Sequence, residues 1–204
     1  MNGAMPELIL ASGSSARRTM LQAAGVTFRV VPADVDEDAI RAGLADSEPD
    51  AGPERVAAVL ARAKSEEVSR REPSALVIGA DQVLALGQEI FTKPADIAAA
   101  RRALRTLAGK PHRLLSAVSI AQGGREAWQH LDVATLAMRD FSDQFLDAYL
   151  ARAGERVCAS VGAYELEGLG IQLFERIEGD YFTILGMPLL PLLNELRVRG
   201  MLQA

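Results

Sequence analysis

Residues 75–86 limit the possible folds more than any other segment, because their sequence ALVIGADQVLAL is apolar almost throughout. Short apolar runs of this kind are typical of buried β-strands, so we predict either a strand pair or one long, bent strand. Asp81 interrupts the run. An ionised carboxylate among apolar neighbours is unfavourable unless it is paired, hydrogen-bonded or bound to a metal ion. Asp81 either caps the next turn or serves a function, and we favour a function because acids embedded in apolar strands are uncommon.

Segments typical of strands and of helices alternate along the rest of the chain. Strands are predicted over residues 8–11, from residue 26, within 112–140 and within 170–186. Helices are predicted over residues 17–25, 53–72, 96–109, 142–154 and 188–200, and a loop over 44–54. Because the block with the Gly123-Gly124 turn resembles hairpins, a mixed sheet fits better than a purely parallel one. We predict an α/β fold over residues 1–204: a single domain of two lobes, with a mixed central sheet flanked by helices and a cleft between the lobes.

Composition excludes several classes of protein. The formal net charge of −5 argues against a sequence-independent nucleic-acid binder, which needs a broad basic face. No apolar run is long enough to span a membrane, and no signal peptide is visible. The single Cys158 excludes an internal disulfide and fits a reducing cytoplasm. Because His112 and His130 lack partners at metal-ligand spacing, any metal is expected to be a hard cation held by carboxylates.

Residues 8–21, LILASGSSARRTML, predict a strand, a small-residue turn and a helix that begins near two arginines. Ser12, Ser14 and their neighbours supply candidate helix N-caps. The start of a helix carries unpaired N–H groups and a positive dipole end, which together bind phosphate well. Arg17 and Arg18 are unfavourable for that dipole unless an anion lies between them. The alternative is that both arginines are solvated surface residues.

Two lysines and an acidic segment leave two interpretations each. Lys64 lies at the edge of the apolar stripe of the helix over 53–72, and Lys93 precedes a proline. Each of these lysines is either solvated or reaches an anion beside Asp81. The acidic segment over 34–38 is either a solvated loop or supplies one ligand to a magnesium ion.

Together these segments resemble the motif set of the Maf nucleotide pyrophosphatases. The matching segments are LILASGSSARRTML, IGADQVLAL with TKP, and VGAYELEGLGIQLFERIEGDYFTILGMPL, in the family's order and over nearly the whole chain. The resemblance implies a two-lobed fold similar to that of inosine triphosphatases, with a nucleoside triphosphate in the cleft. It implies hydrolysis to a nucleoside monophosphate and pyrophosphate, with Mg²⁺ or another divalent cation. It also implies house-cleaning of nucleotide pools in the cytoplasm and a link to septum formation.

The resemblance also implies roles for particular residues. Asp81 matches the proposed proton acceptor and, with Glu37, would hold the metal. The positions that match phosphate-binding and catalytic elements are Ser12, Ser14, Arg17, Lys64 and Lys93.

Four positions depart from the family's common pattern. Many members have Pro-Arg before the key arginine, where this chain has Ser15-Ala16, so one basic side chain is missing unless Arg18 substitutes. Gln82 stands where many members have threonine, and Glu167 where many have glutamine. These two residues resemble the branch that prefers 7-methyl-GTP over dTTP and UTP. A carboxylate at 167 would complement the positive charge of 7-methylguanine, or would instead hold magnesium or an arginine.

Other functions stay open at this point. A dTTP- or UTP-preferring pyrophosphatase fits the same motifs. LILASGSSARR also resembles the glycine-rich turn of nucleotidyltransferases, which need a second substrate. A cell-division regulator that only binds nucleotide is a further alternative, and the sequence leaves open whether the chain forms a homodimer.

Overall fold

A computed structural model describes residues 6–203 as a mixed α/β fold with a seven-stranded sheet in the order β2-β1-β3-β5-β6-β7, with β4 pairing β3. β1 pairs parallel to β2 and β3, whereas β3 pairs antiparallel to β4 and β6 antiparallel to β7. The predicted mixed sheet flanked by helices is therefore confirmed. The strands are Leu8–Leu10 (β1), Arg29–Val30 (β2), Leu76–Leu86 (β3), Glu89–Phe91 (β4), Pro111–Gln122 (β5), Arg125–Met138 (β6) and Phe174–Glu178 (β7).

The chain divides into two compact units. The first holds the chain up to Gln82, Ser116–Asp132 and the chain from Tyr181 onward. The second holds Val83–Leu115 and Val133–Asp180. β3 changes from one unit to the other directly after Asp81 and Gln82, so both of these residues belong to the first unit. The predicted cleft between two lobes stays a prediction.

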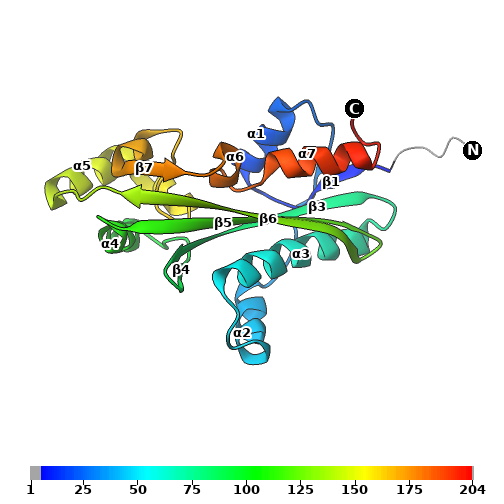
Figure 1. The fold of residues 1–204 in the computed structure, drawn as a ribbon, viewed down its shortest axis with the longest axis horizontal. Helices are drawn as coiled ribbons and strands as arrows, with labels where there is room; N and C mark the ends of the chain where they lie inside the picture. The colour runs from blue at the N-terminus through cyan, green and yellow to red at the C-terminus, as the bar shows by residue number, and fades with distance from the viewer. Residues whose placement is uncertain (1–5, 204) are drawn as a thin grey trace, which may run out of the picture. The chain divides into compact units, whose positions relative to one another are not determined.

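Helices cover both faces of the strands in the first unit (Figure 1). Alternate residues of β1 point to opposite faces, as the period of two requires. Leu8 and Leu10 belong to a core with α1 (Ser15–Ala23) and α7 (Leu189–Val198). Ile9 packs on the other face with Val68 of α3 (Pro53–Arg71). The helices on the two faces of β1 and β3 thus carry different parts of the candidate site.

Gly79 brings α3 into direct contact with β3. A Cβ atom at Gly79 would lie 2.3 Å from the carbonyl oxygen of Ala61 and 2.5 Å from the amide nitrogen of Ser65. Only glycine permits backbones to approach this closely. Lys64 lies in the same turn of α3, and Asp81 follows Gly79 by two residues on β3. The glycine therefore sets the distance at which the lysine and the acid face each other.

Several predicted boundaries are confirmed. β3 is one long strand, and Gly123 and Gly124 form the turn between β5 and β6 with φ of 57° and 78°. α4 (Ile97–Leu107) and α5 (Asp143–Ala153) lie in the second unit, where they pack on each other and on the 3₁₀ helix η1 (Gly154–Ala159). Ser142 caps α5 by accepting a hydrogen bond from the Phe145 amide.

Other segments differ from the prediction. Helix α2 (Glu37–Ser47) begins inside the acidic segment and continues into the predicted loop, because the Asp36 side chain caps it by accepting from the Ala39 amide at 2.9 Å. The strand expected from residue 26 is only β2. The region 170–186 contains, besides β7, the 3₁₀ helix η2 (Leu169–Leu173) and the short helix α6 (Tyr181–Ile184).

Candidate active site

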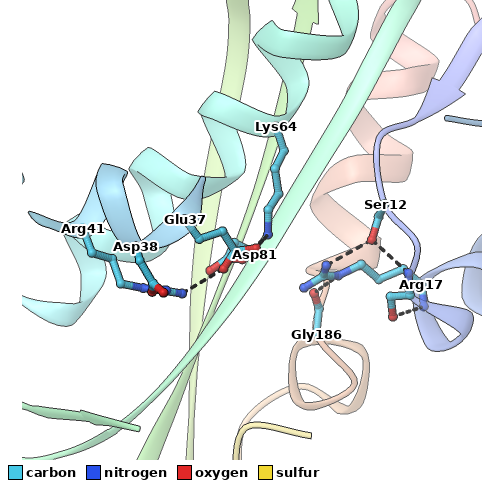
Figure 2. Close-up of polar contacts among 9 residues, drawn as sticks. Ser12, Arg17, Glu37, Asp38, Arg41, Lys64, Asp81 and Gly186 are labelled. Carbon is cyan, nitrogen blue, oxygen red and sulfur yellow. Dashed lines mark hydrogen bonds and ion pairs between the residues drawn. The ribbon is translucent and has the colours of Figure 1, made fainter. Parts of the chain in front are cut away.

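An ion-pair cluster joins β3, α3 and α2, and it is buried at Asp81 and Lys64 but partly exposed at Glu37 and exposed at Asp38. Asp81 is only 5% exposed, and its Oδ1 lies 2.6 Å from the Nζ of Lys64. The same Nζ lies 2.7 Å from Oε1 of Glu37, whose other oxygen accepts from Nη2 of Arg41 at 2.9 Å. Arg41 also pairs with Asp38 at 3.0 Å (Figure 2). One lysine thus bridges two carboxylates that are far apart in the sequence.

The two carboxylates have opposite pKa shifts. Burial raises the pKa of Asp81, against the opposing charges of Lys64 and Arg17. Burial also acts to raise the pKa of Glu37, but the hydrogen bonds and charges of Lys64 and Arg41 outweigh it and hold that pKa below its usual value. Asp81 Oδ2 is buried and has no hydrogen-bond partner in the described part of the chain. Among the described residues, Asp81 is therefore held by hydrogen bonding through Oδ1 and not through Oδ2.

The turn before α1 holds Arg17 in place. Ser14 is the N-cap of α1, and its Oγ accepts from the Arg17 amide at 3.4 Å. Ser12 Oγ accepts from the Ser14 amide at 3.3 Å and from Nη1 of Arg17 at 3.2 Å. Nε of Arg17 donates to the carbonyl oxygen of Gly186 at 2.9 Å. Figure 2 shows Ser12 and Gly186 on either side of the guanidinium, whereas the neighbouring Arg18 is exposed.

Arg17 shares its electrostatic environment with the carboxylate cluster. Burial lowers the pKa of Arg17, and the negative charges of Asp81 and Glu37 act against that shift. An arginine stays protonated despite such burial. Together with the amide groups at the start of α1, the site offers fixed positive charge beside a buried acid, which suits a phosphate group and a reacting water molecule.

Gln82 lies next to Asp81 and faces the C-terminal segment of the chain. Its Nε2 lies 3.0 Å from Ser116 Oγ, 3.1 Å from the Thr183 carbonyl oxygen and 3.0 Å from that of Ile184. Ser116 Oγ in turn donates to the Thr183 carbonyl at 2.7 Å. Both N–H groups of the Gln82 amide are therefore directed at the protein.

The remaining two predicted site residues belong to the second unit. Lys93 is exposed between β4 and α4, and Glu167 is exposed in the turn before η2. Their roles in phosphate binding and base recognition stay predictions.

Sequence reasoning did not single out Arg41 and Gly186. Arg41 follows Glu37 by four residues and Asp38 by three, which is the spacing of helical ion pairs, so recognising α2 would have identified it. Gly186, with φ of 104°, directly follows the apolar segment YFTIL. A glycine after such a segment is a signal for the end of a helix.

Comparison with known proteins agrees with this geometry. The family described as Maf-like protein matches residues 7–199. The chain belongs to the Maf family. A 7-methyl-GTP pyrophosphatase from Mesorhizobium japonicum is 54% identical over 95% of this chain and 96% of its own length. Another 7-methyl-GTP pyrophosphatase, from Rhizobium etli, is 52% identical over 96% of this chain and 97% of its own.

A third relative of this Maf protein has a broader name. It is a nucleoside triphosphate pyrophosphatase from Paramagnetospirillum magneticum, 53% identical over 94% of this chain and 98% of its own length. Among residues 6–203, no helix is both long and apolar enough to cross a membrane.

Proposed function

We propose that this Maf protein is a nucleoside triphosphate pyrophosphatase, which hydrolyses the α–β phosphoanhydride to a nucleoside monophosphate and pyrophosphate. One observation carries the proposal: a buried acid, Asp81, is paired with Lys64 at 2.6 Å and lies within the electrostatic influence of Arg17 at the start of α1. The names of relatives above 50% identity support the same reaction.

Arg17, Ser12, Ser14 and the first amides of α1 bind the phosphates. Ser12 and Gly186 hold the guanidinium through the Nη1 and Nε atoms, so its orientation is set before substrate arrives. Orientation of this kind lowers the barrier because the binding groups need not reorganise during the reaction. Lys64 keeps a positive charge next to Asp81, and Lys93 keeps the phosphate-binding role assigned from the sequence.

Asp81 serves as the general base. Its raised pKa makes it a better proton acceptor than an ordinary aspartate, and Lys64 fixes its Oδ1. A water molecule beside the carboxylate gives its proton to Asp81 as its oxygen bonds to the α-phosphorus. The bond from the α-phosphorus to the bridging oxygen breaks, and pyrophosphate leaves with that oxygen.

Asp81 would hold a magnesium ion, and Glu37 would join it by giving up one of its ion pairs with Lys64 and Arg41. The described residues contain no group of three or more His, Cys, Asp and Glu side chains that could hold a metal ion, but Mg²⁺ commonly uses one or two carboxylates and takes its other ligands from water and substrate phosphates. The unpartnered, buried Oδ2 of Asp81 fits this donor set. When bound, the ion would neutralise negative charge on the phosphates of the substrate.

We further propose 7-methyl-GTP as the preferred substrate, because two of the relatives carry that name. The carboxylate of Glu167 complements the positive charge of 7-methylguanine. A cytoplasmic location fits both a nucleotide substrate and the free thiol of Cys158.

The test is pyrophosphate release from a panel of canonical and modified nucleoside triphosphates, each with and without Mg²⁺. We expect turnover without any acceptor, fastest with 7-methyl-GTP, and a loss of at least about a hundredfold in Asp81→Asn. Asp132→Asn is the matched control, since Asp132 lies in the same unit but pairs with His130 at 3.0 Å. Wild-type turnover in Asp81→Asn would refute its role.

Two other results would contradict the proposed reaction as a whole. Tight nucleotide binding without turnover would identify a nucleotide-binding regulator. Pyrophosphate release only in the presence of a second substrate would identify a nucleotidyltransferase.

A further inference from the structure

The end of helix α6 depends on groups supplied by β3 and β5. The amide of Met187 donates to the Phe182 carbonyl at 3.1 Å and that of Gly186 donates to the Thr183 carbonyl at 3.0 Å. With Gly186 at φ of 104°, this is the Schellman arrangement that ends many helices. A helix of four residues has little stability of its own. Further contacts to its C-terminal carbonyls from elsewhere in the fold therefore add to its stability.

Gln82 and Ser116 supply those contacts. The two N–H groups of the Gln82 amide are shared among three acceptors, the carbonyls of Thr183 and Ile184 and Ser116 Oγ, and Ser116 Oγ itself donates to the Thr183 carbonyl. The reverse orientation of the Gln82 amide would place its oxygen against two carbonyl oxygens, so the contacts fix which end faces α6. Ser116 is fully buried, which makes each of these contacts hard to replace with water.

The residue that follows this capped end is the one that holds Arg17. Gly186 accepts from Nε of Arg17 at 2.9 Å (Figure 2). A Cβ atom on Gly186 would lie 3.6 Å from Nη2 of Arg17 and 3.7 Å from Oε1 of Gln82, so Gly186 lies against both side chains. A chain of direct contacts thus runs from Gln82 through the end of α6 to the guanidinium.

We propose that Gln82 is a positioning residue, which caps α6 and so fixes the Gly186 carbonyl that orients the Arg17 guanidinium toward phosphate. The proposal rests on the proposed function, which gives Arg17 its role. It assigns Gln82 a task distinct from reading the base, because both of its N–H groups are already engaged by the protein.

The variant Gln82→Met tests this, since methionine has similar length and no donor. We expect kcat/KM to fall by about tenfold to a hundredfold for every base alike, because small displacements of a binding group cost this much. We also expect weaker binding of inorganic tripolyphosphate, measured by calorimetry. In an Arg17→Met background, Gln82→Met should cause no further loss, since the positioned group is gone.

Ser116→Ala provides a second route to the same test. It should show the same base-independent pattern with a smaller loss, which keeps the proposal testable if Gln82→Met does not fold. The matched control is Ser119→Ala: Ser119 is on the same strand and equally buried, but it bonds Ser65 and Glu126 away from α6. It should lower thermal stability without changing tripolyphosphate affinity.

Two results would overturn the proposal. A changed base preference with unchanged tripolyphosphate affinity would make Gln82 a base-reading residue. If Gln82→Met lowers kcat/KM equally with and without Arg17, Gln82 does not act through Arg17. If the wild-type protein hydrolyses no nucleotide, the proposed function fails, but the tripolyphosphate measurements still decide whether Gln82 positions Arg17.

Discussion

Replacing Lys64 with methionine should reveal how the buried Asp81 carboxylate is stabilised. The side chains of Lys64 and Asp81 are 13% and 8% exposed, so their pair belongs to the buried class. Removing one partner of such a pair costs about 3–5 kcal/mol, because the other charge is left without compensation. We expect the lower end, about 3 kcal/mol, since the charge of Arg17 still acts on Asp81. Losing the pair of Lys64 with Glu37 adds little to this cost, because Arg41 still pairs with Glu37 at 2.9 Å.

Urea unfolding at pH 7 measures this loss, and the double variant Lys64→Met, Asp81→Asn is its control. With the charge removed as well, the double variant should recover most of the lost stability. Without Lys64, the folded-state pKa of Asp81 rises further above its unfolded value, so the penalty should shrink as pH falls and Asp81 takes up a proton. A loss below about 1 kcal/mol, or simple additivity in the double variant, would refute the reasoning.

Two further predictions concern packing and pH. Gly79→Ala should destabilise the fold by about 1–3 kcal/mol and also slow turnover, because the new Cβ would displace the backbone of α3 near Ala61 and with it Lys64; unchanged melting temperature and turnover would contradict this. Burial lowers the pKa of His112 from 6.5 to about 4. The stability that its neutral form contributes is present above pH 6.5 and is lost as pH falls through 4. Wild type should therefore lose about 2–3 kcal/mol more than His112→Gln between pH 7 and 4.5, and parallel stability curves would contradict the assignment.

The sequence predicted the elements whose signals are local. Ser142 and Gly154 marked the ends of α5 because a hydroxyl cap and a left-handed glycine act within one turn. Asp81 was identified because an ionised carboxylate in an apolar strand is unfavourable unless it is paired, hydrogen-bonded or bound to a metal ion. The close packing of α3 on Gly79 depends on tertiary contact, and no pattern in either segment alone indicates it.

The parts of the site that were missed depend on contacts between distant segments. The 34–38 segment was interpreted only by its charge, so the cap at Asp36 and the helix with Arg41 were overlooked. Gly186 lies 169 residues from Arg17, and only the folded chain brings them together. Gln82 was interpreted through family resemblance, and its hydrogen bonds to the end of α6 could not be inferred from the residues beside it.

The partners of Arg17 have a consequence for ionic strength. The guanidinium is held by a hydroxyl and a carbonyl, both uncharged, whereas the ammonium of Lys64 contacts two anionic side chains. Lys64 is thus already neutralised by its neighbours, and Arg17 keeps its charge for an incoming polyanion. Added salt should therefore weaken substrate capture chiefly through Arg17, while the buried pair of Lys64 and Asp81 should respond little to it.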